Sequence, residues 1–470
     1  MNGWLIPVVA ENQPDSSEPP KENRMTQRLS FQEHIARLRG LIRRCSQGDQ
    51  SPPHFRDEAF AAEFNALASA LFTLQYDRVP AYRRFCQARG VDSGGVARWY
   101  DIPAIPAAAF KDFDLSSLPV EERTAVFHSS GTTTHRPSRH FHNAESLEVY
   151  EASLLPWFGR HVLPEADVQQ FSQKSPTPAP LPEGDLLSDV SEQAPLPGRG
   201  TEVVAPSLHS ASIPRFALDS PAAESNFRFV ILTPCPARAP NSSLVYMLET
   251  VRREFAPNRA DFAGKLDERG GWILDRDLAW AALAQATADD QSVVLLGTAF
   301  SLVELLDWLN EKQRRLQLPP GSRVLETGGY KGRSRALTKT ELYGLITDRL
   351  GIPLTRIVCE YGMSELSSQA YDCVAGTYES QISNLKFEIA ERRFRFPPWA
   401  KVQIISPETG REVGEGETGL IRVFDLANLR SVMAIQTEDL GTRQGDGFKV
   451  LGRAALAEPR GCSLLAVESP

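Results

Sequence analysis

Three stretches between residues 292 and 365 decide the fold: SVVLLGT (292–298), RVLETGG (323–329) and TRIVCEYGMSE (355–365). Each contains a short apolar run that is followed by glycine or polar residues. Runs of this length are typical of buried strands, and the residues that follow them mark the points where the strands end. The sequence therefore predicts a sheet whose strands are buried on both faces.

Segments with helical spacing separate these strands. Amphipathic stretches lie at 301–316 and 340–350, and a fourth strand, FRFVILT (227–233), precedes another amphipathic stretch at 243–255. This alternation predicts βαβ units on a mostly parallel, helix-covered sheet, the α/β class. Ligands of such sheets bind beyond the carboxyl ends of the strands, so we expect the chemistry in the loops that follow them.

The last part of the chain has a different pattern. KVQIIS (401–406), TGLIRVF (418–424) and FKVLG (448–452) are separated by glycines and acidic residues. Short strands with such turns predict a small antiparallel β region beside the parallel sheet. A helix is predicted at 144–162, where Leu147, Tyr150, Leu154 and Trp157 have helical spacing.

Composition excludes several classes of protein. The 470 residues are 41% hydrophobic and carry a net charge of −8, which argues against a fibrous or disordered protein and against nucleic acid as a partner. No apolar run is long enough to cross a membrane and no signal sequence is visible, so a cytoplasmic protein is expected. The six cysteines show no CxxC spacing, which predicts free thiols.

Two segments differ from the rest of the chain. Residues 1–24 are rich in Pro, Ser, Glu and Asn and predict a disordered tail, with Met25 as a second plausible start. A Pro- and Ser-rich stretch at 172–225 predicts a disordered insertion within one domain. We therefore expect a catalytic domain at 25–440 and a short C-terminal segment at 441–470.

The first motif with chemical potential is Ser129-Ser130-Gly131-Thr132-Thr133-Thr134. Hydroxyls and a glycine in one turn can surround phosphate oxygens with O–H and N–H donors. The motif lacks the Gly-Lys-Ser/Thr ending of a Walker A loop. Taken alone, such a Ser/Thr-rich turn is more often a solvated loop.

Two further motifs follow predicted strands. Gly328-Gly329 would let a flat ring lie against the backbone, although a tight turn requires the same residues. Glu360-Tyr361-Gly362-Met363-Ser364-Glu365 combines an aromatic ring, a hydroxyl and a carboxylate. These groups can stack on a base, contact a phosphate and hold Mg²⁺ through oxygen.

A fourth motif, Thr437-Glu438-Asp439-Leu440-Gly441, is predicted to form an acidic turn and is followed by Gly452-Arg453. A carboxylate at a turn can accept hydrogen bonds from ribose hydroxyls, and the arginine can pair with a phosphate. Acidic turns are common, so the motif has little weight by itself.

The order of the four motifs resembles that of the adenylate-forming superfamily of acyl-CoA synthetases and adenylation domains. Within it, the sequence is most similar to the acyl-protein synthetases of bacterial luminescence, the long-chain-fatty-acid–luciferin-component ligases. This resemblance extends over Ile102-Pro103-Ala104-Ile105-Pro106 with Phe110-Lys111, His128 to Thr133, Pro240 to Met247, Thr327 to Ser334 and Arg460 to Leu464.

The resemblance implies a fold, an activity and a set of roles. Such enzymes have a large N-terminal domain, activate a fatty carboxylate with ATP and Mg²⁺ to acyl-AMP, and pass the acyl group to their own cysteine and then to a partner reductase. It implies phosphate binding by Ser129, Ser130, Gly131, Thr132, Thr133 and Thr134; adenine and ribose binding by Gly328, Gly329, Tyr361, Gly362, Ser364 and Asp439; Mg²⁺ binding by Glu365; and catalytic roles for Glu365, Arg453 and Cys462.

The proposed catalytic role of Cys462 requires its own argument, because a free cysteine is usually inert. It directly follows Arg460-Gly461, and a neighbouring guanidinium favours the thiolate, which is the attacking species. Its position also matches the acyl-carrying cysteine of the family. Cys373 is a second candidate, whereas Cys359 ends a predicted buried strand and is expected in the core.

The sequence also departs from the superfamily pattern. The phosphate loop lacks the usual lysine, whose charge Arg136 or Arg139 would supply unless both belong to a solvated loop. After Asp439 only 31 residues follow, so the mobile C-terminal domain and its lysine are expected to be absent or vestigial. Lys449 or Lys331 would then replace that lysine, or no residue would.

Two alternatives stay open at this point. One is an aryl- or acyl-CoA ligase of the phenylacetate type, which shares the motifs but releases its product to coenzyme A. The other is a nucleotide-binding scaffold that has lost turnover. The sequence fixes neither the acyl chain length nor the final acceptor, which is a reductase or an acyl carrier.

Overall fold

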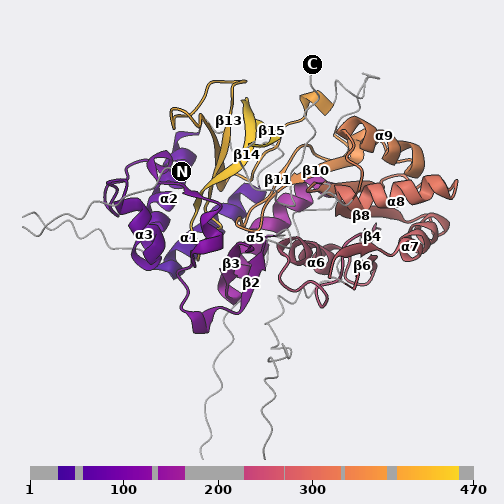
Figure 1. Ribbon diagram of the computed structural model, residues 1–470, viewed down its shortest axis with the longest axis horizontal. Helices are drawn as coiled ribbons and strands as arrows, with labels where there is room; N and C mark the ends of the chain where they lie inside the picture. The colour runs from indigo at the N-terminus through magenta and orange to yellow at the C-terminus, as the bar shows by residue number, and fades with distance from the viewer. Residues whose placement is uncertain are drawn as a thin grey trace, which may run out of the picture.

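The computed structural model describes residues 30–47, 57–129, 136–164, 227–268, 270–329, 334–377 and 389–454. The predicted tail and the predicted insertion lie outside the described residues. Figure 1 shows helices α1–α3 at one end of the molecule, helices α7–α9 at the other, and the two larger sheets between them.

A six-stranded sheet forms one half of the molecule, in the order β11-β10-β9-β8-β4-β5. All neighbouring strands are parallel except β11, which runs antiparallel to β10. Its strands are β4 (Phe227–Ile231), β5 (Ala260–Phe262), β8 (Ser292–Thr298), β9 (Arg323–Thr327), β10 (Ile357–Tyr361) and β11 (Ala370–Tyr371). The prediction of a mostly parallel sheet is confirmed.

Helices cover both faces of this sheet, as predicted. Alternate strand residues such as Val230 and Leu295 pack on one face against α7 (Arg276–Ala288), α8 (Ala299–Glu311) and α9 (Lys339–Leu350). The intervening residues, among them Phe229 and Leu296, pack on the other face against α5 (Ala144–Val162) and α6 (Ser243–Phe255). Both faces are therefore dry, which explains why the strand sequences are continuously apolar.

Helix α8 differs from its predicted span of 301–316. It begins earlier because Thr298 is the N-cap and exchanges hydrogen bonds with Ser301 in a capping box. It ends at Glu311, and Gln313 then has a left-handed φ of 52° that cannot continue a helix.

The second sheet contains β1 (Ile105–Pro106), β12 (Ala400–Ile405), β13 (Thr418–Asp425), β14 (Ala434–Gln444) and β15 (Gly447–Arg453). Strands β12 to β15 are antiparallel neighbours, whereas β1 pairs in parallel with β14. The predicted acidic turn at 437–441 is wrong, because these residues form the middle of β14. Their side chains alternate between buried and half-buried, which is the period of a strand. The expected boundary at residue 440 also falls inside β14, and β15 adds residues 447–453 to the same sheet.

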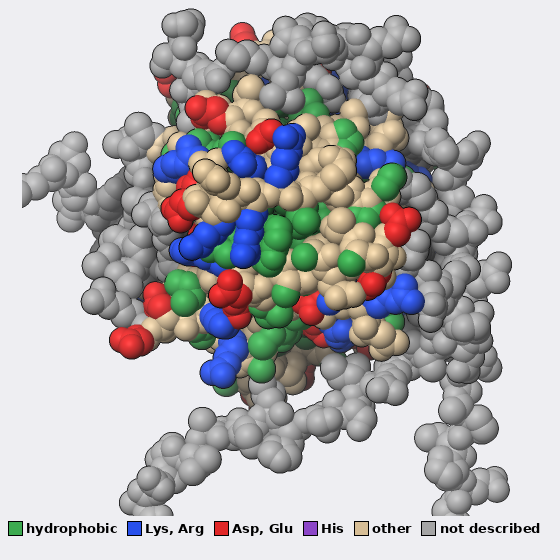
Figure 2. Space-filling view, turned by 90° about the vertical axis from the view of Figure 1, so that its right-hand side faces the viewer, with side chains coloured by type: hydrophobic (Ala, Val, Ile, Leu, Met, Phe, Trp, Pro, Cys, Tyr) green, Lys and Arg blue, Asp and Glu red, His purple; other side chains and the backbone are tan. Residues whose placement is uncertain are grey.

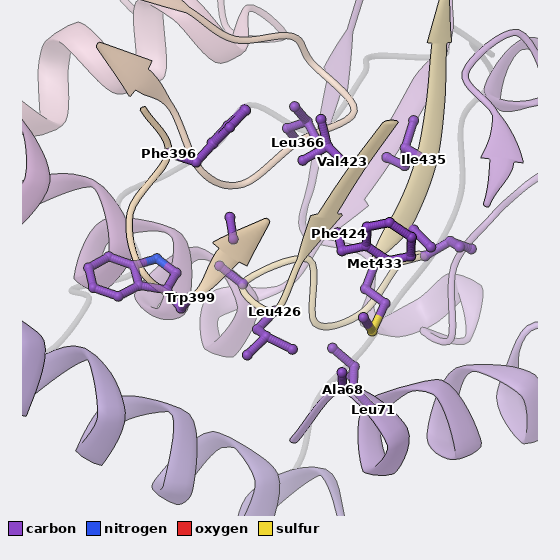
Figure 3. Packing of buried hydrophobic residues seen from close by; sticks show 14 of the residues in the cluster. Ala68, Leu71, Leu366, Phe396, Trp399, Val423, Phe424, Leu426, Met433 and Ile435 are labelled. Atoms are coloured by element: carbon purple, nitrogen blue, oxygen red, sulfur yellow. The ribbon is translucent and has the colours of Figure 1, made fainter. Parts of the chain in front are cut away.

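Three N-terminal helices, α1 (Phe31–Gln47), α2 (Glu58–Arg78) and α3 (Pro80–Gln87), were not predicted. They pack against the second sheet in one hydrophobic cluster. Figure 3 shows Ala68 and Leu71 of α2 close to Leu426 and Met433, and Val423 and Leu366 belong to the same cluster.

Smaller elements complete the described chain. They are α4 (Ala109–Asp112) and two antiparallel hairpins, β2 (Ala125–His128) with β3 (Arg139–His142) and β6 (Gly264–Leu266) with β7 (Trp272–Leu274). The first hairpin brackets the Ser/Thr-rich motif.

Arg323 joins the two chain ends that border the predicted insertion. Its side chain is 1% exposed, and its guanidinium donates a 2.7 Å hydrogen bond to the carbonyl of Val162, the last residue of α5. The same guanidinium lies 4.5 Å from the ring centroid of Phe227, the first residue of β4. The end of α5 and the start of β4 therefore lie next to each other.

The end of the molecule that carries α7–α9 has a mixed surface. Figure 2 shows apolar side chains near the centre of this face, with basic and acidic side chains interspersed around them. The ion pairs Arg276–Glu304, Arg335–Asp307 and Arg315–Asp348 belong to this region. Such mixed charge is not a broad polyanion-binding surface. No helix among the described residues is long and apolar enough to cross a membrane.

Candidate functional site

The structure brings Tyr361, Asp439 and Arg453 together from the two larger sheets. The Tyr361 hydroxyl, at the carboxyl end of β10, donates a 2.9 Å hydrogen bond to Oδ2 of Asp439 in β14. The Arg453 guanidinium, at the end of β15, lies 3.4 Å from Oδ1 of Asp439 and 2.9 Å from Oε2 of Glu438. Residues that sequence reasoning placed in two motifs thus meet at the carboxyl edge of the parallel sheet.

The ring of Tyr361 is itself well covered. Its exposed fraction is 4%, and the rings of Phe394, Phe396 and Phe448 lie with their centroids 5.6–6.2 Å from its own. Burial and the Asp439 carboxylate raise the pKa of the Tyr361 phenol well above its usual value. Tyr361 is therefore a neutral hydrogen-bond donor, and stacking of its ring on adenine stays a prediction.

The Ser364–Glu365 turn follows β10 and is held from several sides. The Ser364 hydroxyl donates to Oε2 of Glu365 over 3.0 Å, and both side chains are buried. Nδ1 of His140 lies 2.9 Å from the Ser364 carbonyl, and the amide of Asn428 donates to the Glu365 carbonyl over 2.8 Å. These contacts fix the turn to β3 on one side and to the second sheet on the other.

Asp425 supports the same turn and was not foreseen from the sequence. Its side chain is 0% exposed and accepts hydrogen bonds from the Ser367 N–H (2.9 Å), the Ser368 N–H (2.8 Å), the Ser368 hydroxyl (2.7 Å) and the Ala427 N–H (3.0 Å). Burial raises its pKa, although the four donors act in the opposite direction. The Ser367-Ser368 pair, which follows the Tyr-Gly-Met-Ser-Glu motif after one leucine, was the available signal.

Ser129, the first residue of the Ser/Thr-rich motif, directly follows β2 and pairs with Ser138, the residue before β3. The Ser129 hydroxyl accepts a 3.0 Å hydrogen bond from the Ser138 N–H, and the Ser129 N–H donates to the Ser138 carbonyl. Ser130, Gly131, Thr132, Thr133 and Thr134 lie outside the described residues, so their phosphate-binding role stays a prediction. Because His140 belongs to β3, the hairpin connects this motif directly to the Ser364–Glu365 turn.

The two arginines that were considered as replacements for the missing lysine are in different settings. Arg139 forms a 2.8 Å ion pair with Asp114, so its charge is already partly neutralised. Arg136 is exposed next to the motif. Lys331 lies outside the described residues, and Lys449 is half-buried in β15. Lys339, at the start of α9, is a further lysine that was not considered from the sequence. Its amine lies 3.9 Å from Oε2 of Glu326.

The glycines of the site have definable roles. Gly328 has a φ of 67°, which turns the chain after β9, and Gly329 follows it. At Gly362 a Cβ atom would lie 2.3 Å from Oε1 of Glu360, so a larger residue here would force that carboxylate to shift. Its other oxygen accepts a hydrogen bond from the Thr327 hydroxyl, and burial raises the pKa of Glu360 to about 7.

The candidate cysteines differ sharply. Cys462 lies outside the described residues. Cys359 and Cys373 are buried, and burial raises the pKa of both thiols well above the usual value, which disfavours the thiolate. Cys235, in the loop after β4, is the half-exposed cysteine of the described chain.

Mg²⁺ has suitable donors but no preformed cage. The described residues contain no group of three or more His, Cys, Asp or Glu side chains that could hold a metal. The Glu365 carboxylate and the Ser364 hydroxyl are oxygen donors, which is the chemistry that Mg²⁺ prefers when substrate phosphates supply the remaining ligands. The donor set therefore fits Mg²⁺ held jointly with a nucleotide.

Buried histidines make the fold sensitive to acid. Burial lowers the pKa of His34, His140 and His161 to about 4, so all three are neutral in the folded protein. The unfolded chain binds these protons below about pH 6.5. Stability is therefore complete above that pH and is lost as the pH falls towards 4.

We expect the free energy of unfolding to fall by roughly 4 kcal/mol from pH 7 to pH 5, since each of these three histidines contributes about 2 kcal/mol and Glu360, with its raised pKa, offsets one of them. His142, whose pKa burial also lowers, acts in the same direction as the three histidines. Urea titrations at the two pH values measure this change. His34→Leu, which removes a histidine without a hydrogen-bond partner in the described chain, should reduce the loss by about 2 kcal/mol. Equal stability at both pH values would contradict neutral buried histidines.

Comparisons with solved structures show the fold. An open conformation of 2-hydroxyisobutyryl-CoA ligase, in complex with 2-HIB-AMP and CoA, has a TM-score of 0.50 and 11% identity; the match covers 84% of this chain and 75% of that one. ATP-bound MatB from Rhodopseudomonas palustris matches with a TM-score of 0.40 and 14% identity over 72% of this chain and 49% of that one. The amide bond synthetase McbA from Marinactinospora thermotolerans matches with a TM-score of 0.39 and 14% identity over 71% and 49%.

Sequence comparisons give a complementary result. No curated protein matches the chain. A family model described as "Acyl-protein synthetase, LuxE" matches residues 224–469, which is more than half of the chain and includes β4 to β15.

Proposed function

This chain belongs to the acyl-protein synthetase (LuxE) family, and from that membership we propose that it activates a carboxylic acid with ATP and transfers the acyl group to its own Cys462. The family and the fold identify a ligase of the acyl-adenylate-forming kind. The observation that carries the proposal is the meeting of Tyr361, Asp439 and Arg453 beyond the carboxyl ends of β9 and β10.

In the first step, a carboxylate oxygen of the acid attacks the α-phosphorus of ATP. A bond forms between them, the bond to pyrophosphate breaks, and acyl-AMP remains. Asp439 binds the ribose hydroxyls, Arg453 and the Ser129–Thr134 motif bind phosphate oxygens, and the Ser364 hydroxyl faces the α-phosphate. Glu365 holds Mg²⁺, which when bound neutralises charge on the phosphates. The site acts mainly by positioning the two reactants.

In the second step, the Cys462 thiolate attacks the acyl carbonyl and AMP leaves with the bonding electron pair. The thiol proton passes to water before the attack, and the neighbouring Arg460 favours its loss. The resulting thioester then supplies a partner protein, a reductase or an acyl carrier. The resemblance described above indicates a long-chain fatty acid as the acyl source.

An acyl-CoA ligase is the second candidate function. The structurally similar 2-hydroxyisobutyryl-CoA ligase was solved with CoA bound, which makes coenzyme A the obvious alternative acceptor to test. The two functions share the first step and differ only in the thiol that receives the acyl group.

ATP–pyrophosphate exchange tests the first step, and a radiolabelled acid tests the second. We expect exchange that depends on a carboxylic acid, together with a protein-bound label that resists acid and is removed by hydroxylamine. AMP release that requires coenzyme A, without labelled protein, would favour the CoA ligase. Absence of exchange with a broad panel of acids would reject both and would leave the nucleotide-binding scaffold.

A further inference from the structure

Glu360 carries a buried carboxylate next to the proposed nucleotide site. Side chains alternate along β10, so Glu360 points to the face opposite Tyr361, the face on which Val358 packs against α5. Its exposed fraction is 7%, and its carboxylate accepts a hydrogen bond from the Thr327 hydroxyl. Within the described ranges no lysine or arginine forms an ion pair with Glu360.

A tyrosine without a partner lies directly across from this carboxylate. Tyr371 is the register partner of Glu360 in the β10–β11 pair, and its side chain is 1% exposed. In the described part of the chain its hydroxyl makes no hydrogen bond. Leaving a buried hydroxyl unpaired costs about 1–3 kcal/mol, so such a group calls for an explanation.

A second tyrosine faces the same charge. Tyr150 of α5 is buried, and its hydroxyl accepts a 3.2 Å hydrogen bond from the amide of Gln369. The Glu360 carboxylate helps to raise the pKa of both tyrosines, after the larger effect of burial. The three side chains thus lie around one region on the α5 side of the sheet, which holds a carboxylate and two phenol hydroxyls.

A cation would stabilise this arrangement. A buried carboxylate without a positive partner is costly, and burial accordingly raises the pKa of Glu360 to about 7. An ammonium group has three donors and no acceptor, and would satisfy the carboxylate and the two phenol oxygens together. The position, one residue before Tyr361, lies beside the place where the acid must meet the nucleotide.

We propose that Glu360, Tyr371 and Tyr150 form a subsite that binds a protonated amino group on the carboxylic acid substrate. The acid would then carry an amino group on its chain, in place of the unsubstituted long-chain fatty acid that the resemblance indicates. This inference rests on the proposed function, because it names the substrate class of the same reaction. It makes Glu360 a specificity-determining residue, with Tyr371 as its hydrogen-bonding partner.

Matched acids that differ only in an amino group test the subsite. ATP–pyrophosphate exchange is measured with ω-aminododecanoate against dodecanoate and with leucine against isocaproate. We expect kcat/KM to be about tenfold or more higher for the amino member of at least one pair, which corresponds to about 1.4 kcal/mol. Glu360→Gln should abolish this preference while it changes kcat/KM for the unsubstituted acid less than about threefold.

Two further variants distinguish the effect of the Glu360 charge from a general effect on folding. Tyr371→Phe should weaken the preference without removing it, and Glu408→Gln, which removes an exposed carboxylate, should leave it unchanged. Thermal melting of each variant checks that it folds. Equal activity with both members of both pairs, or a preference that survives in Glu360→Gln, would overturn the subsite. Exchange with other acids of the broad panel but with none of these four would overturn the subsite alone, whereas absence of exchange with the whole panel would remove the proposed function and this subsite with it.

Discussion

Cys462→Ser protein is expected to catalyse acid-dependent pyrophosphate exchange within about twofold of the wild-type rate, yet to retain none of the hydroxylamine-labile acyl label. The reason is the order of the steps. Exchange requires only that acyl-AMP forms, and no cysteine takes part in that step. Transfer requires an anionic nucleophile, and a serine hydroxyl without an adjacent general base is almost never ionised near neutral pH.

The matched control is Cys235→Ser. Cys235 follows β4 and is half-exposed, whereas Cys45, Cys86, Cys359 and Cys373 are buried. If the label is a thioester at Cys462, Cys235→Ser keeps it in full. Loss of the label in Cys235→Ser and its persistence in Cys462→Ser would transfer the acyl-accepting role to the loop after β4. Mass spectrometry of the labelled peptide identifies the residue directly.

Asp425→Ala is expected to lower the free energy of unfolding by about 3–5 kcal/mol and to reduce exchange more than 100-fold. Removal of the carboxylate leaves three buried N–H groups, those of Ser367, Ser368 and Ala427, without their acceptor. Each unsatisfied donor costs about 1–3 kcal/mol, part of which water or local rearrangement recovers. The turn that carries Ser364 and Glu365 would then lose its anchor on the second sheet.

Urea denaturation and exchange measured well below the melting temperature check the two effects separately. Asp425→Asn should be milder, because one amide oxygen can still accept while the amide N–H group faces another donor. Asp446→Ala is the matched control, since its partly exposed ion pair with Arg395 should contribute at most about 1 kcal/mol. An Asp425→Ala enzyme with wild-type stability and activity would show that the turn holds its position without this carboxylate.

Local patterns predicted much of the architecture. The apolar runs of β4, β8, β9 and β10 and the helices between them were visible because strand and helix periods are properties of neighbouring residues. Helices α1–α3 were missed, although Ile35, Leu38 and Ile42 of α1 have helical spacing. The acidic segment at 437–441 was misread as a turn, since its charges suggested solvent while its partners lie on other strands.

From the sequence, only those candidate site residues that belong to a motif could be predicted. The order of motifs was enough to place Tyr361 and Asp439 in one site, and they form a direct hydrogen bond although 78 positions separate them. Asp425 and the Glu360–Tyr371 pair belong to no motif considered from the sequence, because their significance depends on burial and on partners that only the folded chain brings together. A buried carboxylate and an exposed one look the same in a sequence.

The contacts of Arg323 determine how easily the chain between α5 and β4 can change in length. Because one guanidinium contacts both the last residue of α5 and the first residue of β4, these two ends are held next to each other. Doubling the number of residues between two such fixed points adds only about 0.6 kcal/mol of closure entropy. This junction is therefore a natural place to shorten the protein or to graft a reporter domain, because it lies at the amino ends of β4 and β9, the opposite edge of the sheet from Tyr361.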